Sequence, residues 1–186
     1  MNIMVVGVGG QGTLLTSRII GKTALSAGYD VKLSEVHGMA QRGGSVVTFV
    51  RYGDKVREPV VEEGCVDILI SFERLEAQRY AHFLKPEGII IVNDCRIDPM
   101  TVVIGAQTYP EGIIEKLSAT HTVYTIDGGA VAKELGNSKV LNSVVLGLAA
   151  KYIGFSEEEW IKVLEATVPP KTIEINTKAF KAGYES

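Results

Sequence analysis

The sequence predicts an α/β protein with a Rossmann-like, doubly wound and mostly parallel sheet, an inserted β-hairpin and a helical C-terminal tail. Short apolar runs alternate with stretches of helical periodicity, which is the pattern of strands joined by crossover helices. A glycine-rich turn joins the first apolar run to the first helical stretch. The chain has 186 residues, of which 46% are hydrophobic, so we expect residues 1–186 to form a single domain with a buried core.

The apolar runs predict the strands. Buried parallel strands are expected at residues 3–6, 68–70, 89–92 and 123–126, and the first three are nearly all apolar, as in strands covered on both faces. A fifth, more polar strand is expected at residues 31–36. Residues 46–52 are rich in β-branched and aromatic side chains and precede a Gly-Asp turn. We therefore expect them to pair with Val60-Val61 as a hairpin, inserted where a plain βαβ unit has a helix.

Helices are predicted between and after the strands. They are expected at residues 13–27, with Leu14, Leu15, Ile19, Ala24 and Leu25 near one face; at 73–84, stopped by Pro86; at 110–117; and at 128–135, capped by Asp127. From about residue 139 the tail is expected to be helical. An apolar helix at 140–152 closes at Gly154, a capping-box spacing begins at Ser156, and a last segment at 171–183 follows Pro169-Pro170.

Composition argues against several classes of protein. The formal net charge is −3 and the chain has no basic stripe, so nucleic acid is not the expected partner. No apolar run approaches the roughly 20 residues of a membrane helix, and no signal peptide precedes the first strand, so no membrane association is expected. Cys65 and Cys95 alone fit neither a disulfide framework nor a metal-ligand set, which is typical of a cytoplasmic protein and predicts no metal site.

The first candidate site is the turn formed by Gly7, Gly9, Gly10, Gln11 and Gly12. Its glycines fit G-x-G-x-x-G between a strand and a helix, where Gly7 allows a tight turn, Gly9 a close approach to phosphate, and Gly12 helix–strand contact. The helix N-terminus adds free N–H groups, so the turn is predicted to receive a phosphate or another anion. The alternative is that the glycines merely permit a tight turn.

The second candidate site is a loop formed by His37, Gln41, Arg42, Gly43 and Gly44, which follows the strand at 31–36. Arg42 can hold a carboxylate or phosphate, and His37 can change its charge near neutral pH. The two glycines would let the loop pass close to a substrate or a partner. The alternatives are a histidine bonded to backbone and an ordinary surface salt bridge at Gln41-Arg42.

No catalytic residue is predicted, because no nucleophile–base pair stands at a recognisable spacing. Glu35, near the end of the second strand, keeps open a nicotinamide-dinucleotide-binding domain, since such domains place an acid there for the ribose hydroxyls. Glu73 and Glu76 are expected only to favour the first turn of their helix, and Asn142 is expected to have a structural role.

The first fifty residues also carry a family resemblance. GVGGQGTLLTSRIIGKTALSAGYDVKLSEVHGMAQRGGSVVTFVRYG resembles the small, gamma-type subunit of the 2-oxoacid:ferredoxin oxidoreductases. Within that family, HGMAQRGG is most similar to the indolepyruvate ferredoxin oxidoreductase beta subunits. Later similarities include NSVVLGLAA, around Asn142 and Gly147, and INTKAFKAG, around Asn176, so the resemblance covers nearly the whole chain.

The resemblance implies a role as a subunit of an oxidoreductase. Such a complex decarboxylates an arylpyruvate with thiamine diphosphate, transfers the acyl group to coenzyme A and reduces ferredoxin. Thiamine diphosphate, Mg²⁺ and the iron–sulfur clusters are implied on a larger alpha subunit, so the isolated chain is expected to be inactive and able to self-associate. The alternatives are the gamma subunit of a pyruvate, 2-oxoisovalerate or 2-oxoglutarate enzyme, and a purely structural adaptor.

Overall fold

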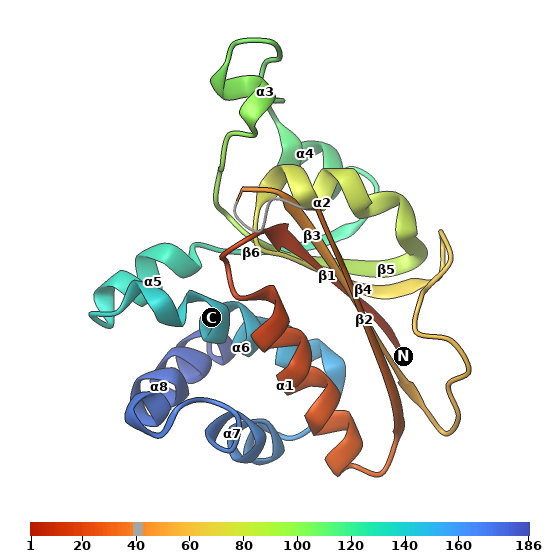
Figure 1. Ribbon diagram of the computed structural model, residues 1–186, viewed down its shortest axis with the longest axis vertical. Helices are drawn as coiled ribbons and strands as arrows, with labels where there is room; N and C mark the ends of the chain where they lie inside the picture. Colours follow the sequence, from red (N-terminus) through yellow and green to blue (C-terminus); the bar gives the residue numbers. More distant parts are fainter. Residues whose placement is uncertain (39–42) are drawn as a thin grey trace.

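The computed structural model describes residues 1–38 and 43–186, and its sheet confirms the predicted fold class. In the described residues six strands lie in the order β2-β3-β1-β4-β5-β6. Their bounds are β1 (Asn2–Val8), β2 (Asp30–His37), β3 (Ser45–Gly53), β4 (Val66–Ser71), β5 (Leu84–Asn93) and β6 (Thr122–Ile126). Strands β1, β4, β5 and β6 are parallel, as expected, whereas β3 is antiparallel to both of its neighbours (Figure 1).

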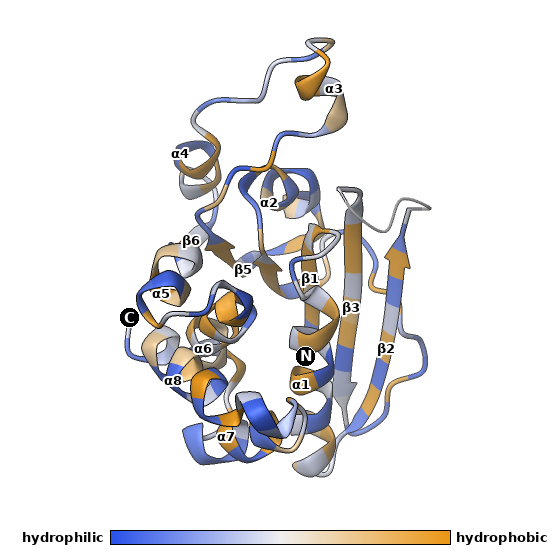
Figure 2. Ribbon diagram, turned by 60° about the vertical axis from the view of Figure 1, so that its left-hand side comes forward, coloured by the Kyte–Doolittle hydropathy of each residue, from blue (hydrophilic) through white to orange (hydrophobic). Residues whose placement is uncertain are grey.

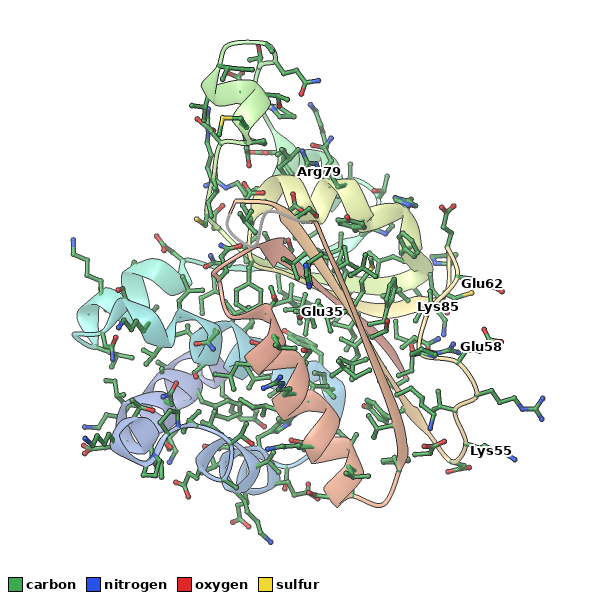
Figure 3. The ribbon with its side chains drawn as sticks, viewed as in Figure 1. Glu35, Lys55, Glu58, Glu62, Arg79 and Lys85 are labelled. Atoms are coloured by element: carbon green, nitrogen blue, oxygen red, sulfur yellow. The ribbon has the colours of Figure 1, made fainter. Side chains whose placement is uncertain are left out.

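The inserted hairpin differs from the expected one. Strand β3 pairs with β2 rather than with Val60-Val61, and it inserts between β2 and β1. Val60-Val61 forms no strand and belongs to an irregular segment at residues 54–65, which we call the strap. The Arg51 guanidinium of β3 donates to the carbonyls of Glu58 and Val60 in this strap, at 3.0 and 2.8 Å. Lys55, Glu58 and Glu62 project from the strap at the amino end of β1 (Figure 3).

Helices cover both faces of the sheet. They are α1 (Thr13–Ser26), α2 (Arg74–Tyr80), α3 (Met100–Val103), α4 (Ile113–Ser118), α5 (Gly128–Glu134), α6 (Leu141–Ile153), α7 (Glu157–Glu165) and α8 (Ile173–Tyr184), with short 3-10 turns at Ala81–Phe83, Ser138–Val140 and Pro170–Thr172. Helices α1 and α5–α8 lie on one face, and α2 and α4 on the other (Figure 1). Alternate residues of β1 therefore enter two cores: Ile3 packs with the α6–α8 layer, and Met4 with the α2–α4 layer.

The helix expected at residues 73–84 is shorter than predicted. It ends at Tyr80, and Leu84 already begins β5, so Pro86 lies inside a strand. The β4–β5 ladder pairs Val66 with Leu84 and then shifts register before it resumes at Ile89. Pro86 falls in this unpaired stretch, where its missing N–H removes no ladder hydrogen bond.

The buried face of α1 was predicted wrongly at its C-terminal end. Leu25 is 63% exposed, whereas Thr16, Ser17 and Thr23 are buried. The hydroxyls of Ser17 and Thr23 donate to the carbonyls of Leu14 and Ile19, at 3.0 and 2.9 Å, so they can be buried without an unsatisfied group. These small side chains allow α1 to lie close to the sheet and the tail helices at once.

The tail is helical from Ser138, as predicted. The capping box at Ser156 is confirmed, because its hydroxyl accepts from the Glu159 N–H while Glu159 accepts from the Ser156 N–H. Helices α6 and α8 cross so closely that a Cβ at Gly147 would lie 2.0 Å from the Phe180 carbonyl oxygen, and one at Gly183 would lie 1.9 Å from that of Val144. None of the described helices is long and apolar enough to cross a membrane.

Candidate functional site

The glycine-rich turn lies at the carboxyl end of β1, where a doubly wound sheet binds its ligands. Gly10 and Gly12 have φ angles of 105° and 84°, in the left-handed region that side chains rarely adopt. Gly12 is the N-cap of α1, which begins at Thr13. The first N–H groups of α1 therefore point out of the helix with no intrahelical acceptor.

Two glycines have different roles from those predicted. Gly7 is part of β1 rather than of the turn, and a Cβ there would lie 2.9 Å from Thr13 Cγ2 and 3.0 Å from Phe72 Cβ. Gly7 therefore provides the helix–strand contact that the sequence assigned to Gly12. A Cβ at Gly12 would instead lie 3.0 Å from Asn142 Nδ2, so Gly12 admits α6 beneath the turn.

Gln11 closes the turn with its side chain. Its Oε1 accepts from the Val8 N–H at 2.7 Å, and its Nε2 donates to the Phe72 carbonyl at 2.9 Å. Asn93 Nδ2 donates to the same carbonyl at 3.1 Å, and Asn93 Oδ1 accepts from the Gly128 N–H at 2.9 Å. The two amides thus join the loops that follow β1, β4, β5 and β6. Both polar ends of Gln11 are used in this structural contact.

A hollow of about 260 Å³ lies beside the turn. It is lined by Gly9, Gly10, Gly12, Thr13, Leu14, Glu35, His37 and Val46. One wall is the positive N-terminus of α1, and another carries the half-buried carboxylate of Glu35, which accepts from Thr48 Oγ1 at 3.4 Å (Figure 3). Such a hollow can bind an anionic group on the helix side and a hydroxyl on the Glu35 side.

The second predicted loop reaches the same hollow. The Gly9 N–H donates to the Gly44 carbonyl at 2.9 Å, so the turn and the loop are joined. His37 is exposed, and its Nδ1 lies 3.0 Å from the Gly38 carbonyl oxygen, as in the backbone-bonded alternative. Gly43 is exposed with a φ of 79°. Gln41 and Arg42 lie outside the described residues.

A buried carboxylate, which the sequence assigned only to the first turn of its helix, holds the end of this loop. Glu76 is 2% exposed, and it accepts from Ser45 Oγ at 2.5 Å and from Arg79 Nη1 at 2.6 Å. The Tyr80 hydroxyl lies 3.1 Å from the same Ser45 oxygen. Burial raises the pKa of the Glu76 carboxyl, and the Ser45 and Arg79 contacts partly oppose this shift. Figure 3 places Arg79 on α2, above the sheet.

Glu73 is buried more deeply and makes three structural contacts. Its Oε2 caps α2 by accepting from the Glu76 N–H at 3.0 Å. Its Oε1 accepts from the Ile97 N–H at 3.1 Å and from the Tyr109 hydroxyl at 2.5 Å. The expectation that Glu73 and Glu76 serve only the helix dipole was therefore incomplete. Long-range partners such as Ser45 and Tyr109 leave no signal in local sequence.

The described residues do not fit the cofactors of the implied complex. Cys65 precedes β4 and Cys95 follows β5, so the two thiols lie at opposite ends of neighbouring parallel strands. No group of three His, Cys, Asp or Glu side chains in the described part of the chain can hold a metal ion. Asp127 Oδ1 accepts from the Ala130 N–H at 2.8 Å as the cap of α5. The described residues therefore provide no ligand set for a metal ion or an iron–sulfur cluster.

Comparison with known proteins agrees with the resemblance found in the sequence. The model of the family described as pyruvate ferredoxin/flavodoxin oxidoreductase matches residues 2–186. The indolepyruvate oxidoreductase subunit IorB of Thermococcus kodakarensis is 41% identical, with 100% of this chain and 95% of that protein covered. IorB of Archaeoglobus fulgidus is 42% identical, with 99% and 94% covered.

Solved structures show the same fold. The gamma subunit of a keto/oxoacid ferredoxin oxidoreductase from Geobacter sulfurreducens has a TM-score of 0.74 at 25% identity, with 99% of this chain and 96% of that chain covered. The 2-oxoglutarate:ferredoxin oxidoreductase of Magnetococcus marinus has a TM-score of 0.76 at 21% identity, with 100% of this chain but 30% of that longer chain covered. With its whole length matched in both sequence and fold, the chain belongs to the pyruvate ferredoxin/flavodoxin oxidoreductase family.

Proposed function

We propose that the chain is the small subunit of an indolepyruvate-type ferredoxin oxidoreductase, which decarboxylates an arylpyruvate, forms the acyl-coenzyme A and reduces ferredoxin. The observation that carries the proposal is full-length identity of 41% to IorB of T. kodakarensis, against 27% to the pyruvate synthase subunit PorC of Methanothermobacter thermautotrophicus. Both matches cover almost the whole chain, so the difference in identity favours the arylpyruvate enzyme.

In this proposal the larger subunit performs the chemistry. Thiamine diphosphate, Mg²⁺ and the iron–sulfur clusters belong to that subunit, and they supply the decarboxylation and the electron path to ferredoxin. The buried acids described here support this division, because Glu73 and Glu76 are engaged by neighbouring N–H, hydroxyl and guanidinium groups. The isolated chain is therefore inactive. Both cysteines are free thiols, which supports a cytoplasmic location.

The contribution of this chain is a shaped surface at the carboxyl edge of the sheet. The N–H groups of Gly10, Gly12 and α1 receive an anionic group of the substrate or coenzyme. The loop with His37, Gln41, Arg42, Gly43 and Gly44 faces the substrate or coenzyme channel of the larger subunit. The hydrogen bond from Gly9 to the Gly44 carbonyl supports a joint role for the two segments.

The test is reconstitution with the larger subunit. Each purified subunit alone should reduce no ferredoxin with indolepyruvate and coenzyme A, whereas the mixture should be active and should prefer indolepyruvate to pyruvate. Arg42→Ala should lower turnover of the mixture without unfolding the chain, whereas Arg57→Ala, at an exposed arginine near the opposite edge, should not. Full activity of the larger subunit alone would refute the proposal and favour a structural adaptor.

A nicotinamide-binding domain is a second candidate because Glu35 lines the same hollow as the glycine turn. The inserted strand β3 weakens it, since β3 separates β2 from β1 and displaces Glu35 by one strand spacing, about 4.8 Å. Titration of the chain with NADH distinguishes the two candidates. Saturable micromolar binding would favour the dinucleotide domain, and no binding is expected.

A further inference from the structure

The segment at residues 94–112, which we call the arm, leaves the carboxyl end of β5 and returns to α4. It includes α3 and projects beyond the body of the molecule (Figure 1). Met100, Val103 and Ile104 at its tip are 71%, 66% and 68% exposed. No other large hydrophobic side chain in the described residues is as exposed as these three. Figure 2 shows the hydrophobic colour of α3 at the end of the projection.

The tip carries no charge. Residues 99–110 contain no Lys, Arg, Asp, Glu or His, whereas Arg96, Asp98 and Glu111 flank them. Exposed apolar area costs about 25 cal/mol per Å² relative to burial. A folded chain that projects an uncharged apolar tip into water therefore gains free energy when a partner covers it.

The base of the arm is fixed to the body. One carboxylate oxygen of Glu73 accepts from Ile97 on the outgoing leg and from Tyr109 on the returning leg, at 3.1 and 2.5 Å. The Arg96 guanidinium lies 4.4 Å from the centre of the Tyr109 ring, and Arg74 pairs with Asp94. Glu73 is 1% exposed, so both legs are tied to a buried anchor. Because the arm is already held in place, binding through its tip costs little conformational entropy.

We propose that the tip of the arm is an anchor that inserts into an apolar pocket of the larger subunit of the same oxidoreductase. This inference rests on the proposed function. A contact between the tips of two copies would fall far short of the roughly 800 Å² that each partner buries in a stable interface, and the neighbouring edge that could widen it is the one proposed above to meet the larger subunit. The tip must belong to a wider contact. The arm rises from the same sheet edge as the glycine turn and the 43–44 loop, which supply that wider surface.

The test measures assembly with the larger subunit by titration calorimetry. The triple variant Met100→Gln, Val103→Thr, Ile104→Thr keeps the β-branching at 103 and 104 and most of the size of the tip but makes it polar, and it should raise the dissociation constant about tenfold or more. The matched control is Leu25→Gln, at an exposed leucine of α1 outside the arm, which should leave the constant unchanged. Thermal unfolding of each variant alone should match that of the parent.

A crosslink identifies the occupant. With p-benzoylphenylalanine in place of Ile104, irradiation of the parent assembly should give an adduct with the larger subunit. An adduct with a second copy or with ferredoxin, or an unchanged dissociation constant for the triple variant, would overturn the inference. These outcomes leave the proposed function standing. If the parent chain does not bind the larger subunit at all, the proposed function fails and the inference fails with it.

Discussion

Glycine serves two purposes in two regions of this molecule. At the carboxyl edge of the sheet, Gly10, Gly12 and Gly43 adopt left-handed φ angles of 105°, 84° and 79°, and a Cβ at Gly10 or Gly43 would meet nothing within 4 Å. At the crossing of α6 and α8, Gly147 and Gly183 have ordinary helical backbone, yet a Cβ there would lie within 2.0 Å of a backbone oxygen. The first region needs glycine for conformation, and the second needs it for space.

The difference separates recognition from stability. The edge glycines leave open turns and a hollow that another molecule can enter. The crossing glycines let α6 and α8 pack with their backbones in contact. Ser143 Oγ donates to Asn176 Oδ1 across the same contact, at 2.7 Å. The segments NSVVLGLAA and INTKAFKAG, which carried part of the resemblance, are therefore two sides of one helix contact. This helix contact also supports the carboxyl edge of the sheet, because Asn142 of α6 packs against Gly12 of the glycine turn.

The largest effect is expected at the helix crossing. Gly147→Ala should lower the free energy of unfolding by on the order of 3 kcal/mol or more, because α6 and α8 must separate to admit the methyl group. Urea denaturation measures it. Gly21→Ala in α1 is the control, since its Cβ would meet the nearest atom at an ordinary 3.5 Å. Equal stability of the two variants would contradict the steric argument.

The next effect is expected at the base of the arm. Glu73→Gln replaces one carboxylate oxygen with an NH₂ group, so either the α2 cap or the contacts with Ile97 and Tyr109 lose their acceptor. The expected loss is about 2 kcal/mol of unfolding free energy. Amide hydrogen exchange at Ile97 should also quicken. Glu87→Gln, at an exposed carboxylate of β5, is the control, and an equal loss there would remove the special role of Glu73.

A smaller effect is expected in the glycine turn. Gln11→Ala removes two hydrogen bonds, those with the Val8 N–H and the Phe72 carbonyl, and should cost about 1–2 kcal/mol. Because Asn93 still binds the Phe72 carbonyl, this carbonyl is not left without a donor. Thermal unfolding measures the loss. An unchanged melting temperature would mean that the Gln11 side chain does not hold the turn closed.

The smallest effect is a pH dependence at Glu76. Its pKa is raised above the ordinary 4.5, chiefly by burial, so the folded chain binds its proton more tightly than the unfolded chain. The corresponding stabilisation is complete below pH 4.5 and is lost as the pH rises through the raised value. The stability of the parent relative to Glu76→Gln should therefore fall between these two pH values, in denaturation at stepped pH. A relative stability that rises with pH would give the opposite sign.

Local patterns predicted the strands and caps, because strand burial, the Asp127 cap and the Ser156 capping box depend on neighbours in sequence. Contacts between distant segments were beyond such patterns. The sequence did not predict the pairing of β3 with β1, the hydrogen bond from Arg51 to the Val60 carbonyl, or the arm between β5 and α4. Leu25 was assigned to the core because periodicity cannot show which side of α1 faces water.

At the candidate site, the sequence placed the turn and the loop each after a predicted strand, and the Gly9–Gly44 hydrogen bond joins the two segments. The sequence could not show that Gln11 is engaged by the protein itself, since its partners Val8 and Phe72 come from different strands. Glu73 was misjudged for the same reason. A buried carboxylate with distant donors resembles an ordinary helix-capping acid when only its neighbours are read.

We propose that the carboxyl edge of the sheet meets the larger subunit and that the helical layer does not. Hydrogen–deuterium exchange of the chain alone and in the assembly tests this directly. Assembly should slow exchange at residues 9–14, 43–46 and 97–108 and leave α7 and α8 unchanged. Slower exchange confined to α7 and α8, with the edge unchanged, would contradict the account.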